Sequence, residues 1–254
     1  MAAHGKRVGL VTGGGRGIGR EIALALAREG CAVAVAARTM REIEEAAAAV
    51  RLAGPAALAV PLDVTDPAAV GRAVARVADT LGPVDVLVNN AGIAGSAPLL
   101  KTEPDLWERH MKVNVTGPYL MTRAVLGGML ERGWGRVINI ASLAGLYGAP
   151  YVTAYTASKH ALVGFTRALA MEVSGTGVTA NAICPGYVAT DLVWNAARNI
   201  EKKTGKTFDE AVEGMARINP GGRLLEPAEV AAVVVKLFYD DVTNGETVVL
   251  DATT

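Results

Sequence analysis

The chain has 254 residues, 51% of them hydrophobic, and its 25 acidic residues balance 25 basic residues. A net charge of zero gives no electrostatic case for nucleic acid as a main partner, and this length fits one α/β domain with a large core. Met1–Arg7 lacks the apolar core of a signal peptide and no stretch approaches a membrane-spanning run, so we expect a cytoplasmic protein with no membrane partner.

The first element is a short apolar run, Val8–Val11, that leads into a glycine-rich turn and then a helical pattern. The turn carries Gly13, Gly17 and Gly19, a relaxed form of the dinucleotide-binding spacing. Glycine permits tight turns and close backbone approach, and amides at the start of the following helix can face a pyrophosphate. The pattern predicts a dinucleotide site, the alternative being an ordinary glycine-rich turn between strand and helix.

The second expected strand, Ala32–Ala37, ends on a residue that bears on the choice of cofactor. An acidic side chain there would bind the ribose 2′-hydroxyl of NAD, but the position holds Ala37, followed by Arg38. Arg16 lies within the glycine-rich turn. Two guanidinium groups with no competing carboxylate suit a 2′-phosphate, which favours NADPH over NAD. The alternative for Arg38 is an ordinary solvated charge.

The fifth expected strand, Arg136–Ile140, is followed by Ser142, whose hydroxyl would lie at the carboxyl edge of the sheet, where ligands bind in open α/β folds. Tyr155 and Lys159 are four residues apart, so a helix places them on one face. An ammonium beside a phenol favours the phenolate and lowers the pKa of the phenol. The set suggests acid–base chemistry, although Tyr155 and Lys159 could instead be an amphipathic surface pair.

Strand and helix patterns alternate along the whole chain, with no repeat or linker, so we expect one α/β domain over residues 1–254. Its fold would be a Rossmann-like, doubly wound parallel sheet of about seven strands with helices on both faces. Residues 187–220 mix charged and amphipathic positions and are expected to form a substrate lid. The remaining expected strands are 57–60, 84–88, 178–183 and 247–250, and the expected helices are 41–52, 67–81, one or two within 98–129, 153–173 and 227–238.

Four motifs in order resemble the short-chain dehydrogenase/reductase family from Val8 to about Asp251. They are Thr12-Gly13-x-x-x-Gly17-x-Gly19, Asn89-Asn90-Ala91-Gly92, Ser142 with Tyr155-x-x-x-Lys159, and Pro185-Gly186. The resemblance implies an oxidoreductase in which Tyr155 donates a proton to a carbonyl oxygen, Ser142 hydrogen-bonds that oxygen, and Lys159 lowers the pKa of Tyr155. Asn114 matches the residue that distorts its helix and holds a water beside the lysine, although a buried structural amide is an equal alternative.

The resemblance also implies a cofactor site. Asp63 and Val64 would lie against the adenine, although Asp63 could instead cap a turn, and Val188 and Thr190 would hold the nicotinamide carboxamide. The cofactor residues expected in this way are Gly13, Arg16, Gly17, Ile18, Gly19, Arg38, Asp63, Val64, Asn90, Ala91, Gly92, Tyr155, Lys159, Pro185, Gly186, Val188 and Thr190. Among His4, His110 and His160, none belongs to a cluster with metal-ligand spacing; His110 is expected to be exposed or structural, and we expect no metal.

The expected substrate is a 3-oxoacyl thioester or a bulky apolar ketone, because several segments resemble 3-oxoacyl reductases and polyketide ketoreductases. Related 3-hydroxybutyrate dehydrogenases grip a carboxylate at positions that here hold Ala94, Ala144 and Val152, which disfavours a free acid. The substrate side chains expected are Ala94, Leu143, Ala144, Tyr147, Tyr151 and Trp194, with ordinary packing as an equal alternative. A homotetramer or homodimer is expected, with an acyl carrier protein as a possible partner. Oxidation of a secondary alcohol with NAD and a non-catalytic dinucleotide sensor are the other candidate functions.

Overall fold

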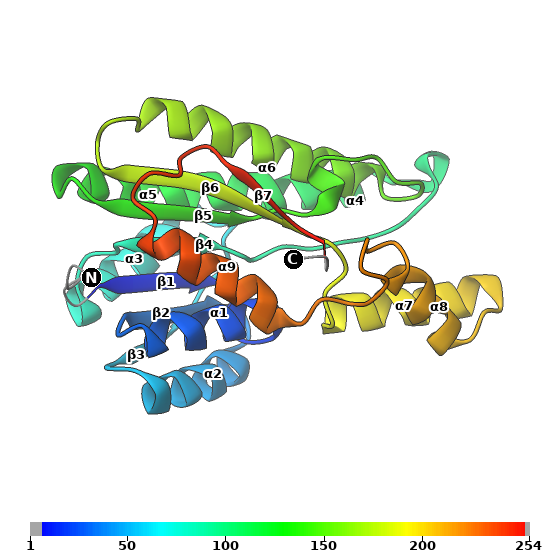
Figure 1. Ribbon diagram of the computed structural model, residues 1–254, viewed down its shortest axis with the longest axis horizontal. Helices are drawn as coiled ribbons and strands as arrows, with labels where there is room; N and C mark the ends of the chain where they lie inside the picture. Colours follow the sequence, from blue (N-terminus) through cyan, green and yellow to red (C-terminus); the bar gives the residue numbers. More distant parts are fainter. Residues whose placement is uncertain (1–6, 252–254) are drawn as a thin grey trace.

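A seven-stranded parallel sheet organises the molecule, in the order β3-β2-β1-β4-β5-β6-β7 within residues 7–251, the part that the computed structural model describes (Figure 1). The expectation about the N-terminal leader falls mostly on residues 1–6, outside the described part. The strands are β1 (Val8–Thr12), β2 (Ala32–Ala37), β3 (Ala57–Pro61), β4 (Val86–Asn89), β5 (Gly135–Ile140), β6 (Val178–Pro185) and β7 (Thr247–Leu250).

The strand order reverses between β1 and β4, which pair directly through Gly9–Val86, Leu10–Leu87 and Val11–Val88. From β1 the chain winds outward through β2 to β3, then returns to β4 and winds the other way to β7. In such sheets ligands bind at the carboxyl ends of the strands beside this reversal. The expected doubly wound sheet is therefore confirmed, and its topology indicates where a ligand site should lie.

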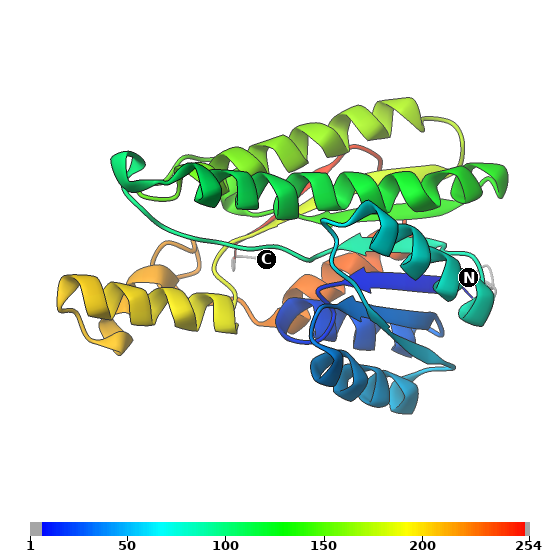
Figure 2. The ribbon, with the colours of Figure 1, turned by 180° about the vertical axis from the view of Figure 1, so that it is seen from behind.

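Helices cover both faces of the sheet (Figures 1 and 2), which explains why its strands are continuous runs of valine, alanine and isoleucine. One core joins the sheet to α1, α2 and α9, and a second core joins the opposite face to α3, α5 and α6. These helices are α1 (Gly17–Arg28), α2 (Met40–Ala53), α3 (Pro67–Leu81), α5 (Gly117–Glu131), α6 (Thr153–Glu172) and α9 (Pro227–Tyr239).

Two helices lie beyond the carboxyl edge of the sheet, α7 (Asp191–Thr204) and α8 (Phe208–Ala216) (Figure 1). They pack on each other through a small core of Val193, Ala197, Ala211 and Met215. These helices occupy the segment expected to be a lid, and they project from the sheet on the side where its strands end. None of the helices within residues 7–251 is long and apolar enough to cross a membrane.

Candidate active site

The glycine-rich turn between β1 and α1 depends on its glycines for steric reasons. Gly13 and Gly17 have φ angles of 63° and 53°, which favour glycine. A Cβ on Gly19 would collide with the backbone oxygen of Gly13 and the side-chain amide of Asn90. The glycines therefore let the turn pack closely before α1, and the backbone amides at the start of that helix fit a bound pyrophosphate.

Asn90 and Ala91 are tied to the same turn across the β1–β4 reversal. The Asn90 side-chain amide donates to the carbonyl oxygens of Thr12 and Gly13 at 3.0 and 3.1 Å. The backbone amides of Asn90 and Ala91 both donate to the Thr12 hydroxyl at 3.0 Å. Gly92 follows and is exposed. These contacts hold the ends of β1 and β4 together, so Thr12 joins the site as a positioning residue.

Arg16 is exposed at the mouth of the turn and has acidic neighbours. Its Nη1 lies 3.4 Å from Asp191 Oδ2 and 3.7 Å from Glu42 Oε1. The expectation that no carboxylate competes for the two arginines is therefore wrong for Arg16. The expectation rested only on the end of β2, where Ala37 stands in place of an acidic residue. The competing carboxylates come instead from α2 and α7. Arg38 is exposed at the end of β2, and its positive charge contributes to lowering the pKa of Asp63.

Asp63 and Val64 follow β3 and shape the loop that leads to α3. The Asp63 carboxylate accepts hydrogen bonds from the Thr65 backbone amide at 2.9 Å and the Thr65 hydroxyl at 2.8 Å. The backbone hydrogen bond is the main cause that lowers the Asp63 pKa, with a smaller contribution from Arg38. Val64 is buried against Gly117 at the start of α5. Asp63 therefore has the turn-capping role that was one of its two interpretations.

The loop after β5 and helix α6 bring Ser142, Tyr155 and Lys159 together. Lys159 is buried, with 6% of its surface exposed, and its Nζ donates to the carbonyl oxygen of Ile140, the last residue of β5, at 2.8 Å. The same Nζ lies 5.8 Å from the centre of the Tyr155 ring. Ser142 caps the short helical turn Leu143–Gly145 by accepting from the Ala144 amide at 3.1 Å. The residues predicted from helical spacing and from a strand-end position thus lie together at one edge of the sheet.

Burial dominates the ionisation of both catalytic candidates on α6. It lowers the pKa of Lys159 to about 8, because desolvation disfavours the ammonium. It raises the pKa of Tyr155, an effect that a side-chain hydrogen bond with Ser142 opposes. The net shift of the Tyr155 pKa is therefore upward, opposite to the lowering expected from Lys159. A neutral phenol at neutral pH is a proton donor, whereas a phenolate is a proton acceptor.

Asn114 is buried in a π-helical turn, Lys112–Thr116, between α4 (Pro104–Met111) and α5. Its side chain donates to the Ile93 carbonyl oxygen at 2.9 Å and to the Ser158 hydroxyl at 3.0 Å, and it accepts from the Ile93 amide at 2.9 Å. Ser158 in turn donates to the Tyr155 carbonyl oxygen at 2.7 Å. The amide thus joins the loop after β4 to the helix that carries Tyr155, through Ser158, which the sequence analysis missed.

The segment that follows the end of β6 at Pro185 is held by Asn219, a second residue that the sequence analysis missed. The buried amide of Asn219 accepts from the Tyr187 backbone amide at 2.8 Å and donates to the Tyr187 carbonyl oxygen at 2.9 Å. A Cβ on Gly186 would collide with the Asn219 oxygen, which explains the glycine. Asn219 lies 32 residues after Tyr187 along the chain, so no local pattern could have indicated the contact.

The other expected cofactor residues lie close to the glycine-rich turn. The Thr190 hydroxyl donates to the Val188 carbonyl oxygen at 3.2 Å. A Cβ on Gly17 would lie 3.3 Å from Thr190 Cγ2, so the segment after β6 contacts the glycine-rich turn directly. Ile18 is half-buried on the first turn of α1. The cofactor residues from β1, β4 and β6 are therefore brought to one edge of the sheet.

The expected substrate residues lie on three segments around this edge. Ala94 is exposed on the loop after β4, Leu143 and Ala144 are half-buried after β5, and Trp194 on α7 contacts Phe208 of α8 with ring centres 6.3 Å apart. The loop of Ala94 and the loop before α6 are joined by a hydrogen bond from the Ala97 amide to the Tyr151 carbonyl oxygen at 2.8 Å.

Two exposed tyrosines stand on the loop that precedes α6. Tyr147 and Tyr151 are 65% and 63% exposed. Tyr151 has a φ of 68°, the only positive φ of a non-glycine residue within residues 7–251. This conformation costs a bulky side chain roughly 1–2 kcal/mol. The loop therefore holds an aromatic ring in a strained position close to the catalytic helix.

His110 on α4 was expected to be either exposed or structural. It is buried, so its environment is the structural one. Its Nδ1 donates to the Leu106 carbonyl oxygen at 2.7 Å, and its Nε2 has no hydrogen-bond partner in the described structure. The imidazole meets the Tyr155 ring edge-on, with ring centres 6.3 Å apart. His110 thus packs against the Tyr155 ring, a contact that no sequence pattern could indicate.

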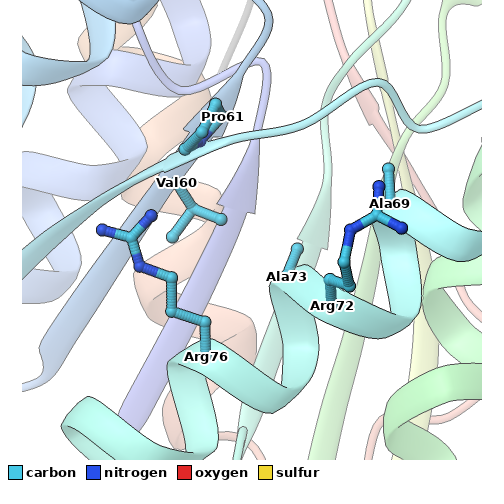
Figure 3. Close-up of a pocket in the computed structure, with 6 residues that line it drawn as sticks. All are labelled: Val60, Pro61, Ala69, Arg72, Ala73 and Arg76. Atoms are coloured by element: carbon cyan, nitrogen blue, oxygen red, sulfur yellow. The ribbon is translucent and has the colours of Figure 1, made fainter.

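A separate hollow of about 190 Å³ lies between β3 and α3, away from the catalytic residues (Figure 3). Its lining includes Arg72 and Arg76, whose guanidinium groups extend toward different sides of the hollow and do not converge. It offers no cluster of acid–base groups, so we do not assign the chemistry there. Within residues 7–251, no group of three or more His, Cys, Asp or Glu side chains could hold a metal ion.

Comparisons with known proteins agree with this geometry. Residues 7–201 match a family model described as short chain dehydrogenase. A solved structure of an actinorhodin polyketide ketoreductase variant with NADPH superposes with a TM-score of 0.94 and 38% identity, covering 99% of this chain and 98% of that one.

Two curated relatives cover most of the chain. An acetoacetyl-CoA reductase of Rhizobium meliloti is 42% identical over 238 residues, which are 92% of each protein. A 2-(S)-hydroxypropyl-CoM dehydrogenase of Xanthobacter autotrophicus is 39% identical over 230 residues, 91% of this chain and 88% of that protein. Similar proteins thus include enzymes named for reduction and enzymes named for oxidation.

Proposed function

The chain belongs to the short-chain dehydrogenase family of oxidoreductases that act on ketone and alcohol groups, and we propose that it uses NADPH to reduce a ketone to a secondary alcohol. The proposed substrate is a 3-oxoacyl thioester or a bulky apolar ketone. The observation that carries the proposal is the convergence of Ser142, Tyr155 and Lys159 at the end of β5.

The residues present fit the nicotinamide cofactor. Gly19 packs closely on Gly13 and Asn90, which a Cβ would prevent, and this packing holds the start of α1 at the glycine-rich turn, where its backbone amides would face a pyrophosphate. Arg16 and Arg38 are the groups proposed to hold a 2′-phosphate, and Thr190 the group proposed to hold the carboxamide. When bound, the cofactor supplies the hydride that the ketone carbon receives.

In the proposed reaction, Tyr155 donates its phenolic proton to the carbonyl oxygen while the carbon receives the hydride, so the product is a neutral alcohol. Ser142 hydrogen-bonds the same oxygen and stabilises its developing charge. Burial raises the pKa of Tyr155, so the phenol holds its proton at neutral pH and can donate it to the carbonyl oxygen. Lys159 holds a positive charge beside Tyr155 and stabilises the phenolate that remains. Asn114 fixes the loop and helix between which a proton could return to Tyr155.

The preference for a thioester or apolar ketone rests on the side chains around the catalytic edge. Ala94, Ala144 and Val152 offer no charge to a free carboxylate, whereas Tyr147 and Tyr151 present exposed aromatic surface. Helices α7 and α8 are proposed to act as the lid over this surface, and a homodimer or homotetramer is the proposed assembly. An acyl carrier protein is the proposed partner if the thioester is protein-bound.

The test is an assay of NADPH consumption with acetoacetyl-CoA, a bulky cyclic ketone and free acetoacetate. We expect turnover of the first two and little with the free acid. Tyr155→Phe should lower turnover by at least about 10²-fold, the scale of general acid catalysis, while NADPH binding, followed by cofactor fluorescence, persists. Tyr119→Phe, which changes an exposed tyrosine on α5, is the matched control. Unchanged turnover in Tyr155→Phe would refute the assigned chemistry.

Oxidation of an alcohol with NAD is the second candidate, since one relative is named a dehydrogenase. Titration with NADPH and NADH separates the two, because each tenfold preference corresponds to about 1.4 kcal/mol. A preference for NADPH of about tenfold or more supports the arginines as phosphate ligands. Equal binding, or a preference for NADH, would direct the search to alcohols. Cofactor binding without any turnover would instead indicate a dinucleotide sensor.

A further inference from the structure

The guanidinium of Arg16 lies between two carboxylates that come from distant parts of the chain. Asp191, the first residue of α7, places Oδ2 3.4 Å from Arg16 Nη1. Glu42, in the first turn of α2, places Oε1 3.7 Å from the same nitrogen. One cation at the edge of the cofactor turn is therefore shared by two anions.

Both carboxylates are held near the glycine-rich turn by backbone packing. A Cβ on Gly15 would lie 2.9 Å from Glu42 Cβ, so α2 presses directly on the turn. Thr190, the residue before Asp191, packs against Gly17. The segments of α2 and α7 that carry the two carboxylates thus lie against the turn, whatever rotamer the long Arg16 side chain adopts.

A 2′-phosphate and these carboxylates would bind the same donors. A guanidinium presents five N–H donors and stays charged at any physiological pH, so it pairs with either group. The Arg16 and Asp191 side chains are 65% and 61% exposed, so their ion pair is weak and can exchange for another anion without leaving a charge buried. A phosphate group carries close to two negative charges, so it competes well with a carboxylate for the guanidinium.

We propose that Asp191 and Glu42 compete with the 2′-phosphate of NADP for Arg16, and so limit how strongly the protein distinguishes NADPH from NADH. The inference rests on the proposed function in one respect, that Arg16 binds this phosphate. It adds two specificity-determining residues outside the end of β2, where cofactor choice is usually sought.

The experiment measures dissociation constants of NADPH and NADH for the wild type, Asp191→Asn and Glu42→Gln by cofactor fluorescence. An exposed ion pair contributes roughly 0.2–1 kcal/mol, so each substitution should tighten NADPH binding by up to about fivefold and leave NADH unchanged. Asp209→Asn and Glu44→Gln remove exposed carboxylates from α8 and α2 and are the matched controls. Added salt should shrink the gain, because it screens exposed charges.

A double-mutant cycle with Arg16→Gln tests whether the carboxylates act through Arg16. The gain from Asp191→Asn should disappear in the Arg16→Gln background. A gain that persists there, or that Asp209→Asn reproduces, would show a general charge effect and overturn the inference.

The cycle also separates this inference from the proposed function. If Arg16→Gln weakens NADPH binding but neither carboxylate substitution strengthens it, the inference alone fails. If Arg16→Gln leaves NADPH binding unchanged, the assignment of Arg16 as a phosphate ligand fails, and the inference fails with it.

Discussion

The buried Lys159 should make the stability of the protein depend on pH in a way that can be calculated. Burial lowers its pKa from the usual 10.5 to about 8. Between these values the unfolded chain binds more protons than the folded protein, so the free energy of unfolding rises with pH. Over the full interval the contribution is about 3 kcal/mol, at roughly 1.4 kcal/mol for each unit. Between about pH 7 and 9.5 it is about 2 kcal/mol.

Urea denaturation of the wild type and Lys159→Met at several pH values tests this calculation. The variant removes the ammonium, so the stability difference, wild type minus variant, should increase by about 2 kcal/mol across that range. Lys112→Met, which removes an exposed lysine from the neighbouring π-helical turn, controls for the loss of one positive charge. A difference that stays flat would refute the assignment of a desolvated ammonium at position 159. The measurement needs no substrate, so it is independent of the proposed reaction.

Three further substitutions probe the scaffold of the site. Gly19→Ala places a methyl group against the Gly13 backbone and should weaken cofactor binding at least about tenfold in a fluorescence titration, since the turn must move. Asn114→Ala removes three hydrogen bonds to Ile93 and Ser158 and should lower the free energy of unfolding in urea by about 2–5 kcal/mol, because it leaves buried groups unpaired. Tyr151→Gly should raise the midpoint of thermal unfolding, because it relieves a strained φ that costs roughly 1–2 kcal/mol. The same substitution should raise KM for a bulky ketone more than for a small one. A lower midpoint would contradict the strain argument, and an equal change in both KM values would contradict a substrate role for the ring.

The sequence predicted those parts of the fold that local patterns encode. The apolar runs gave every strand, and α3 begins where Pro67 and the capping side chain of Asp66 indicate. The helical spacing and the strand-end position also brought Ser142, Tyr155 and Lys159 together. The observed boundaries differ from the predicted ones by one or two residues where the apolar pattern extends beyond the residues that pair with a neighbouring strand. Strand β4, for example, begins at Val86 rather than at residue 84.

What the sequence could not predict depends on contacts between distant segments. Asn219 clamps a turn 32 residues away, and the carboxylates beside Arg16 come from α2 and α7. The direction of the Tyr155 pKa depends on how deeply the helix buries the phenol, which spacing alone does not reveal. In each case the missing information is three-dimensional proximity.

Lys159, Tyr151 and the π-helical turn around Asn114 each carry a local energetic cost. Lys159 is a desolvated cation, Tyr151 has an unfavourable φ, and Asn114 interrupts a helix with a π-helical turn. Strain of this kind persists only where the surrounding structure fixes it. All three lie on segments that follow β4 or β5, central strands whose residues are almost all buried on both faces. Buried central strands are the support for these segments, and the site lies at the middle of the sheet, beside the reversal of strand order, rather than near β3.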